Sequence, residues 1–126
     1  MQLTKIIPVF FAFQNNLKLY HWTTTSFARH KASDDLSASM NDLIDRFVET
    51  SIAKVGRPTK LPNDASKIML KTTSDAEAPE MLASMVSYLT NDLPKQMHPK
   101  NDVDLLAIRD DMVEQLNKTL YLFTLE

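Results

Sequence analysis

The sequence predicts an all-α fold, a four-helix bundle in a single domain covering residues 1–126. Three observations support this prediction. A length of 126 residues is typical of one domain. The single glycine leaves little material for the tight hairpin turns of a β-sheet. Apolar residues recur at steps of three and four, the spacing that places side chains on one face of a helix.

The first helix is expected over residues 4–22. Pro8 is tolerated only in the first turn of a helix, so the start lies either near Thr4 or at Pro8 itself. The run of threonines and serine at 23–26 ends this helix and offers N-caps for the next. The apolar stripe consists of Leu3, Ile6, Phe10, Phe13, Leu17 and Tyr20.

The second helix is expected from Phe27 to Val55. It ends at Gly56, where a left-handed residue closes a helix, and Pro58 follows two residues later. Its apolar face is directed at the core, as is usual for a surface helix of a bundle. The residues of this face are Leu36, Met40, Leu43, Ile44, Phe47 and Val55.

Residues 56–75 form a long connection, with one short helical turn expected at Ala65–Leu70. Ser74 and Glu77 have the spacing of a capping box before a third helix that ends near Asn91, although Pro79 is an alternative start. A connection of this length crosses a bundle from end to end. The helix order is therefore that of a ferritin-like bundle, in which a long crossover joins the second and third helices.

The fourth helix is expected to run from a cap at Asn101 or Asp102 to the last residues of the sequence. Pro94 and Pro99 bracket a tight connection before it. The apolar stripe of this helix consists of Leu105, Leu106, Met112, Val113, Leu116, Leu120 and Phe123.

Charge and composition exclude several classes of protein. Lys and Arg number 14 against 16 Asp and Glu, a net charge of −2, and no basic run is present, so DNA binding is not expected. The absence of cysteine excludes disulfides, zinc ribbons and iron–sulfur clusters, so any metal must bind to oxygen and imidazole ligands. The apolar stretch at 6–13 is too short to span a bilayer, so we expect a soluble, cytoplasmic protein without membrane association.

Four potential metal ligands lie on one strip of the second helix. With His30 at zero on a helical wheel, Asp34 falls at about 40°, Asp45 at about 60° and Glu49 at about 100°. His30 with Asp34, and Asp45 with Glu49, are each spaced i, i+4, so that each pair can chelate one ion. A solvated helix face is the alternative explanation of this strip.

The two pairs cannot share one ion within a single chain. They are separated along the helix by roughly 16 Å, at about 1.5 Å per residue. An antiparallel pairing of this helix with its own copy across a two-fold axis would bring one pair of each chain to the other pair of its mate. The midpoint of the strip falls at 39–40, beside the small residues Ser37, Ala38 and Ser39.

These residues resemble the ligand signature of the Dps-type miniferritins, the family of DNA protection during starvation. The similar segments are the stretch from Leu17 to Trp22 with His21, then His30 with Asp34, then Asp45 with Glu49. The resemblance implies a ferritin-like bundle with a ferroxidase centre between two-fold-related subunits. It implies that His21, His30 and Asp34 of one subunit and Asp45 and Glu49 of its mate bind iron and serve its oxidation.

The implied function is oxidation of Fe(II) by peroxide or oxygen, for iron sequestration and protection from oxidative damage, in a two-fold dimer or a dodecameric cage. The alternative is a metal-free ferritin-like structural or interaction dimer without enzymatic activity. His21 and His30 are closer in sequence than in the family, so whether His21 reaches the metal stays open. Trp22 is either the aromatic neighbour of the iron site or a core residue. Asp102 and Asp104 either line an acidic pore or compensate a helix dipole.

Overall fold

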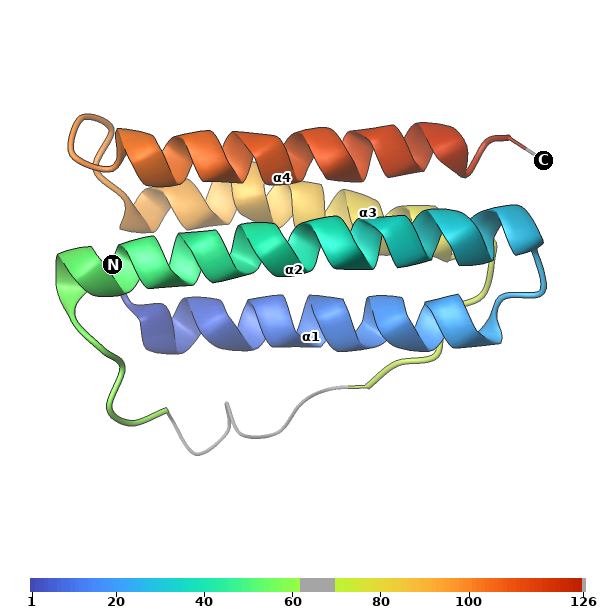
Figure 1. Ribbon diagram of the computed structural model, residues 1–126, viewed down its shortest axis with the longest axis horizontal. Helices are drawn as coiled ribbons and strands as arrows, with labels where there is room; N and C mark the ends of the chain where they lie inside the picture. Colours follow the sequence, from blue (N-terminus) through green and yellow to red (C-terminus); the bar gives the residue numbers. More distant parts are fainter. Residues whose placement is uncertain (62–69, 126) are drawn as a thin grey trace.

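The computed structural model of the protein describes residues 1–61 and 70–125, and within these ranges it contains helices and no β-strand (Figure 1). This part of the chain confirms the prediction of an all-α fold with four α-helices. A π-helical turn, η2 (Tyr88–Asp92), and a 3₁₀ turn, η3 (Leu93–Gln96), follow the third of them. The α-helices are α1 (Leu3–Thr23), α2 (Phe27–Val55), α3 (Ala78–Ser87) and α4 (Val103–Leu122).

The helices pack side by side in a bundle. α1 packs along α2, α2 along α4, and α4 along α3, whereas α1 and α3 approach each other less closely. In Figure 1, α2 ends at one end of the bundle and α3 begins at the other, so that these two helices run in the same direction. The connection from Gly56 to Glu77 therefore joins opposite ends of the molecule, as the sequence predicts.

α1 begins at Leu3, so the alternative of a start at Pro8 is wrong. Pro8 lies inside the helix and lacks only the N–H that would bond to the carbonyl of Thr4, four residues earlier. Ile6 and Phe10, on either side of Pro8, are 0% and 1% exposed. The free energy gained by burying these two side chains offsets the loss of one hydrogen bond, so α1 remains helical at the proline.

The predicted caps of α2 are confirmed. The Ser26 hydroxyl oxygen accepts a hydrogen bond from the backbone N–H of Arg29 at 3.2 Å, as an N-cap does. Gly56 ends the helix with a φ of +89°, a conformation that side chains disfavour.

The capping box before α3 is also confirmed. The N–H of Glu77 donates to the Ser74 hydroxyl at 3.2 Å, and the N–H of Ser74 donates to a carboxylate oxygen of Glu77 at 3.3 Å. The helical turn expected at Ala65–Leu70 lies outside the described residues except for Leu70, which is not helical.

The chain remains helical beyond Asn91, where the third helix was expected to end. It passes through η2 and η3 as far as Gln96, so the expectation that Pro94 begins the connection is wrong. Leu89 and Leu93 are both 0% exposed, and their burial favours a continuous helical path. Pro94 has no N–H to donate to the preceding turn, and the carbonyl oxygen of Leu89, five residues earlier, accepts a hydrogen bond from the Arg109 guanidinium at 2.9 Å.

α4 begins at Val103, preceded by Asp102 as its N-cap residue. This confirms the predicted position of the cap, but the carboxylate of Asp102 makes no hydrogen bond to an N–H of α4. Instead, a carboxylate oxygen of Asp102 accepts a hydrogen bond from the N–H of His98 at 2.7 Å. Asp102 thereby fixes the turn before the helix rather than the first turn of the helix.

The core lies between the helices and contains most of the predicted apolar stripes. Val55, which was expected in it, is 50% exposed because it lies in the last turn of α2, beyond the end of the neighbouring helices. No helix in the described ranges has the length and apolar character needed to cross a membrane. The largest fully buried side chains are Tyr20, Phe10, Phe47, Ile6, Leu17, Leu36, Met40, Leu82, Leu89, Leu93, Leu105 and Met112.

Candidate metal site at the turn between α1 and α2

The end of α1 and the start of α2 bring His21 and His30 together. Their rings stack with centroids 3.9 Å apart and an interplanar angle of 18°. The Nδ1 atom of His21 lies 2.7 Å from the carbonyl oxygen of His30, and Nδ1 of His30 lies 2.8 Å from the carbonyl oxygen of His21. The short turn thus holds the two histidines in a reciprocal arrangement, with His21 buried and His30 exposed.

These contacts determine which ring nitrogen carries the proton. A carbonyl oxygen only accepts hydrogen bonds, so Nδ1 donates in both histidines. The Ser33 hydroxyl, 3.4 Å from Nδ1 of His21, is a second neighbour of that atom and itself donates to the carbonyl of His30 at 3.1 Å. In a neutral imidazole of this tautomer Nε2 has a free lone pair, which is the arrangement of histidines that bind metal ions through Nε2.

Asp34 lies on the Nε2 side of His21. One of its carboxylate oxygens is 3.8 Å from Nε2 of His21 and 3.9 Å from Nζ of Lys18. Nitrogen and oxygen ligands bind first-row metal ions at about 2.0–2.2 Å, so two donor atoms separated by 3.8 Å can reach one ion between them. The Asp34 side chain is 59% exposed, which leaves this position open to solvent or to another chain.

Asp45 and Glu49 lie on the same helix as Asp34 but away from the histidines. Both are exposed, and neither makes a hydrogen bond or ion pair within the described part of the chain. α2 is continuous from Phe27 to Val55, so the step from Asp34 to Asp45 is roughly 16 Å. The described residues of one chain contain no group of three or more His, Cys, Asp or Glu side chains placed to hold a metal ion. Within one chain, His21 contacts both His30 and Asp34, but the three side chains are not arranged around one ion position, and Asp45 and Glu49 lie apart from them.

Trp22 is 67% exposed, so the alternative that it is a core residue is wrong. It follows the buried His21, and rotation by one residue along α1 turns its indole to the surface. The ammonium of Lys18 lies 5.7 Å from the centre of the ring, a cation–π contact. The same lysine lies near Asp34, so Trp22 and the candidate ligands share one face of the molecule.

A polar cluster that was not predicted holds this turn in place. The hydroxyls of Tyr20 and Thr24 both donate to Oδ1 of Asp75 at 2.7 Å. Arg29 donates to the Tyr20 hydroxyl at 3.2 Å and to the carbonyl of Asp75 at 2.7 Å, and its guanidinium lies 4.6 Å from the centre of the Phe123 ring. The cluster thereby joins the α1–α2 turn to the segment before α3 and to the end of α4.

The protonation states within this cluster follow from its contacts. Hydrogen bonds from Thr24 and Tyr20 lower the pKa of Asp75, so the carboxylate is charged at neutral pH. Burial, followed by the bond to Asp75, raises the pKa of Tyr20, so its hydroxyl remains a donor. The one local signal for the cluster is Tyr20 on the core stripe, because a buried tyrosine hydroxyl usually has a partner.

Asp102 and Asp104 lie at the opposite end of the bundle and contact α2. Nζ of Lys54 is 2.9 Å from a carboxylate oxygen of Asp104 and 3.7 Å from one of Asp102, and it donates to the carbonyl of Asn101 at 2.8 Å. Within one chain, the two aspartates are therefore partners of a lysine. The bond from Lys54 lowers the pKa of Asp104, and the bond to Asp104 raises the pKa of Lys54.

A family of unknown function, DUF5856, matches residues 21–123. The chain belongs to this family. It is also similar to an uncharacterized 14.6 kDa protein in the mobD-ri intergenic region of Enterobacteria phage T4, with 31% identity over 107 residues, which are 84% of this chain and 75% of the phage protein. No solved structure matches the chain. The DUF5856 region begins at His21 and includes all the candidate ligands.

Proposed function

We propose that two copies of this DUF5856 protein bind Fe(II) between them and oxidise it, as the resemblance to the Dps-type miniferritins implies. The observation that carries the proposal is the pair of stacked histidines, whose Nδ1 atoms donate to carbonyls and leave both Nε2 atoms for a metal. The proximity of Asp34 to Nε2 of His21 supports it. His21, His30 and Asp34 of one chain supply one half of the site, and Asp45 and Glu49 of its mate supply the other.

The geometry of α2 supports a shared site. Two antiparallel copies of α2 that cross near residues 39–40 place the Asp34 end of each chain beside the Asp45 end of the other. Ala38 is exposed, and Ser37 and Ser39 are half-buried, so small side chains face the proposed crossing point. The side chains of Asp45 and Glu49 are exposed and make no hydrogen bond or ion pair in the described chain. They are therefore accessible to a metal ion held by a second subunit.

The ligand types suit iron as a substrate. Carboxylate oxygens stabilise Fe(III), while imidazole nitrogens favour Fe(II) over calcium and magnesium. In the reaction with hydrogen peroxide, each of two Fe(II) ions gives up one electron. Peroxide takes both electrons and two protons and is reduced to two molecules of water. The proposed role is iron sequestration and protection from oxidative damage.

The packing order of the helices also supports a ferritin-like relationship. α1 lies beside α2, α2 beside α4 and α4 beside α3, and α2 and α3 run in the same direction (Figure 1). Ferritin-like bundles combine four antiparallel neighbours with one long crossover in this manner. The proposed assembly is a two-fold dimer or a dodecameric cage of such dimers, in the cytoplasm and without DNA binding.

A metal-free interaction dimer is a second candidate function. The observation that favours it is the exposure of two aromatic side chains at the same turn, Trp22 at 67% and Phe27 at 78%. Large exposed aromatic residues are typical of protein interfaces. This function requires the same subunit contact but none of the five ligands.

The decisive experiment adds Fe(II) anaerobically, then peroxide or oxygen, and follows ferric absorbance. We expect D34A and D45A each to abolish oxidation. An equal mixture of the two variants that exchanges subunits should recover about a quarter of the sites, since half of the dimers are mixed and half of their sites carry no lesion. D111A changes an exposed aspartate of α4 and is the matched control.

A second variant tests the subunit contact without changing a ligand. A38R places a large charged side chain at the proposed axis, so we expect monomers without oxidation activity. Sedimentation velocity measures the assembly, and circular dichroism checks the fold. A folded A38R monomer that oxidises iron at the wild-type rate would contradict the shared site. A wild-type dimer that leaves Fe(II) unoxidised would favour the metal-free function.

A further inference from the structure

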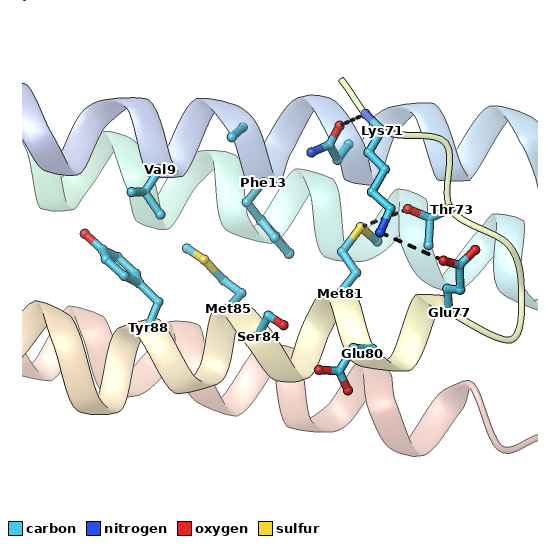
Figure 2. Close-up of a pocket in the computed structure, with 12 residues that line it drawn as sticks. Val9, Phe13, Lys71, Thr73, Glu77, Glu80, Met81, Ser84, Met85 and Tyr88 are labelled. Atoms are coloured by element: carbon cyan, nitrogen blue, oxygen red, sulfur yellow. Dashed lines mark hydrogen bonds and ion pairs between the residues drawn. The ribbon is translucent and has the colours of Figure 1, made fainter. Parts of the chain in front are cut away.

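A cavity of about 370 Å³ lies between α1 and α3, on the side of the bundle where two neighbouring helices approach least closely. Figure 2 shows side chains from both helices directed into it: Val9 and Phe13 from α1, and Met81 and Met85 from α3. Phe13 and Met85 are buried, and the other two are half-buried. The walls of the cavity are therefore apolar along most of its length.

The side chains of Lys71 and Thr73, which are both hydrogen-bond donors, lie together at one end of this cavity in the segment that precedes α3 (Figure 2). Each makes one long contact within the described part of the chain. The ammonium of Lys71 is 3.9 Å from Oε2 of Glu77, and its side chain is 74% exposed. Within the described residues, the hydroxyl of Thr73 donates to the sulfur of Met81, at 3.9 Å. The backbone N–H of Lys71 donates to Oδ1 of Asn16 in α1 at 2.9 Å, which holds the segment at the cavity.

The carboxylates near this end have other roles. Oε1 of Glu77 accepts hydrogen bonds from the N–H and the hydroxyl of Ser74, and these bonds lower the pKa of Glu77. Glu80 also lines the cavity, with its carboxylate directed away from Lys71 in Figure 2. Among the carboxylates of the described residues, that of Glu77 is within ion-pair distance of the ammonium of Lys71, so a ligand anion competes with Glu77 there.

We propose that this cavity binds a medium-chain aliphatic carboxylate, with the chain between Phe13, Met81 and Met85 and the carboxylate on Lys71 and Thr73. The volume lies within the range of small-molecule sites, and such sites combine apolar walls with a few polar groups that orient the ligand. The unbranched methionine side chains adapt to a flexible apolar chain. The site is separate from the proposed iron site, and its occupancy is measured without metal.

The test is isothermal titration of the metal-free protein with decanoate, decanol and decyltrimethylammonium below their micellar concentrations. We expect decanoate to bind more tightly than decanol, and the cationic amphiphile to bind most weakly, because the ammonium of Lys71 attracts an anion and repels a cation. K71M should weaken decanoate about tenfold and leave decanol unchanged. K118M removes an exposed lysine of α4 and should change neither.

A second pair of variants separates the charge from the cavity. E77Q keeps the capping-box geometry and removes the competing charge, so decanoate should bind more tightly. S84W fills the cavity from an exposed position of α3, so both decanoate and decanol should lose binding while the melting temperature is maintained. Absence of decanoate binding to the folded wild-type protein would overturn the proposal. Equal binding of all three amphiphiles, unaffected by K71M, would equally overturn the assignment of a carboxylate ligand.

Discussion

The two ends of the bundle are held together by polar clusters that differ in burial. At the end with the α1–α2 turn, Asp75 accepts hydrogen bonds from Tyr20, which is 0% exposed, and from Thr24, while Arg29 bonds to both Tyr20 and the Asp75 backbone. At the other end, Lys54 bonds to Asp104, whose side chain is 50% exposed, and to the carbonyl of Asn101. Each cluster joins segments that are distant in the sequence.

The difference shows which end of the molecule is built for precise positioning. Removing a partner from a buried hydrogen-bonded group leaves an unsatisfied atom, whereas water replaces the partner of an exposed ion pair. The buried cluster includes Tyr20 and Arg29, which are direct neighbours in sequence of His21 and His30. We therefore expect the Asp75 cluster to fix the stacked histidines, and the Lys54 cluster to contribute little beyond local order.

The largest expected effect is that of D75A. The substitution leaves the buried hydroxyl of Tyr20 and the hydroxyl of Thr24 without their acceptor, so the free energy of unfolding should fall by about 2–3 kcal/mol. Urea denaturation followed by circular dichroism measures it. D111A, at an exposed position of α4, should change stability by less than about 0.5 kcal/mol. A loss of stability in D75A no larger than that in D111A would contradict a stabilising role of the Asp75 cluster.

Acid titration tests whether the charge of the Asp75 carboxylate stabilises its end of the bundle. The pKa of Asp75 is lower in the folded protein than in the unfolded chain, so the stabilisation by its carboxylate is complete above the unfolded pKa, about 4 for aspartate. It is lost as the pH falls through the lower folded pKa. D75N keeps an acceptor oxygen but carries no charge. We expect the stability difference between wild type and D75N to shrink as the pH falls from 6 to 3, measured by urea denaturation at each pH. A difference that is constant with pH would contradict a role for the charge.

The smallest expected effect is that of K54M. The bond to Asp104 raises the pKa of Lys54, so any stabilisation is present below the ordinary lysine pKa and is lost as the pH rises through the higher folded value. The pair is exposed, so K54M should lower the melting temperature much less than D75A does. Addition of 1 M NaCl should remove most of the difference from wild type, because salt screens exposed charges. A large decrease that persists in salt would place Lys54 among the essential contacts.

Local patterns were sufficient to predict the helices and their caps. The stripe of apolar residues in α1, the cap at Ser26, the positive φ of Gly56 and the capping box from Ser74 to Glu77 all depend on residues a few positions apart. The interactions that stabilise these features form within one or two helical turns, so their residue types appear together in the sequence. The exceptions are Pro8 and Pro94, whose local preferences were overridden by burial of their neighbours.

The ligand strip on α2 was likewise visible in the sequence, because the angular spacing of His30, Asp34, Asp45 and Glu49 depends only on helical periodicity. The contact between His21 and His30 was not, since it depends on the path of the turn between two helices. The exposure of Val55 was equally undetermined, because it depends on where neighbouring helices end.

Residue patterns along the chain predict the all-α class, the helix boundaries to within a few residues and the candidate ligands. Tertiary structure alone decided that Tyr20 meets Asp75, 55 residues later, and that α1 and α3 leave an apolar cavity between them. The physical reason is that helix formation is governed by bonds between near neighbours. Packing depends on shapes and charges from the whole chain, and no short segment contains that information.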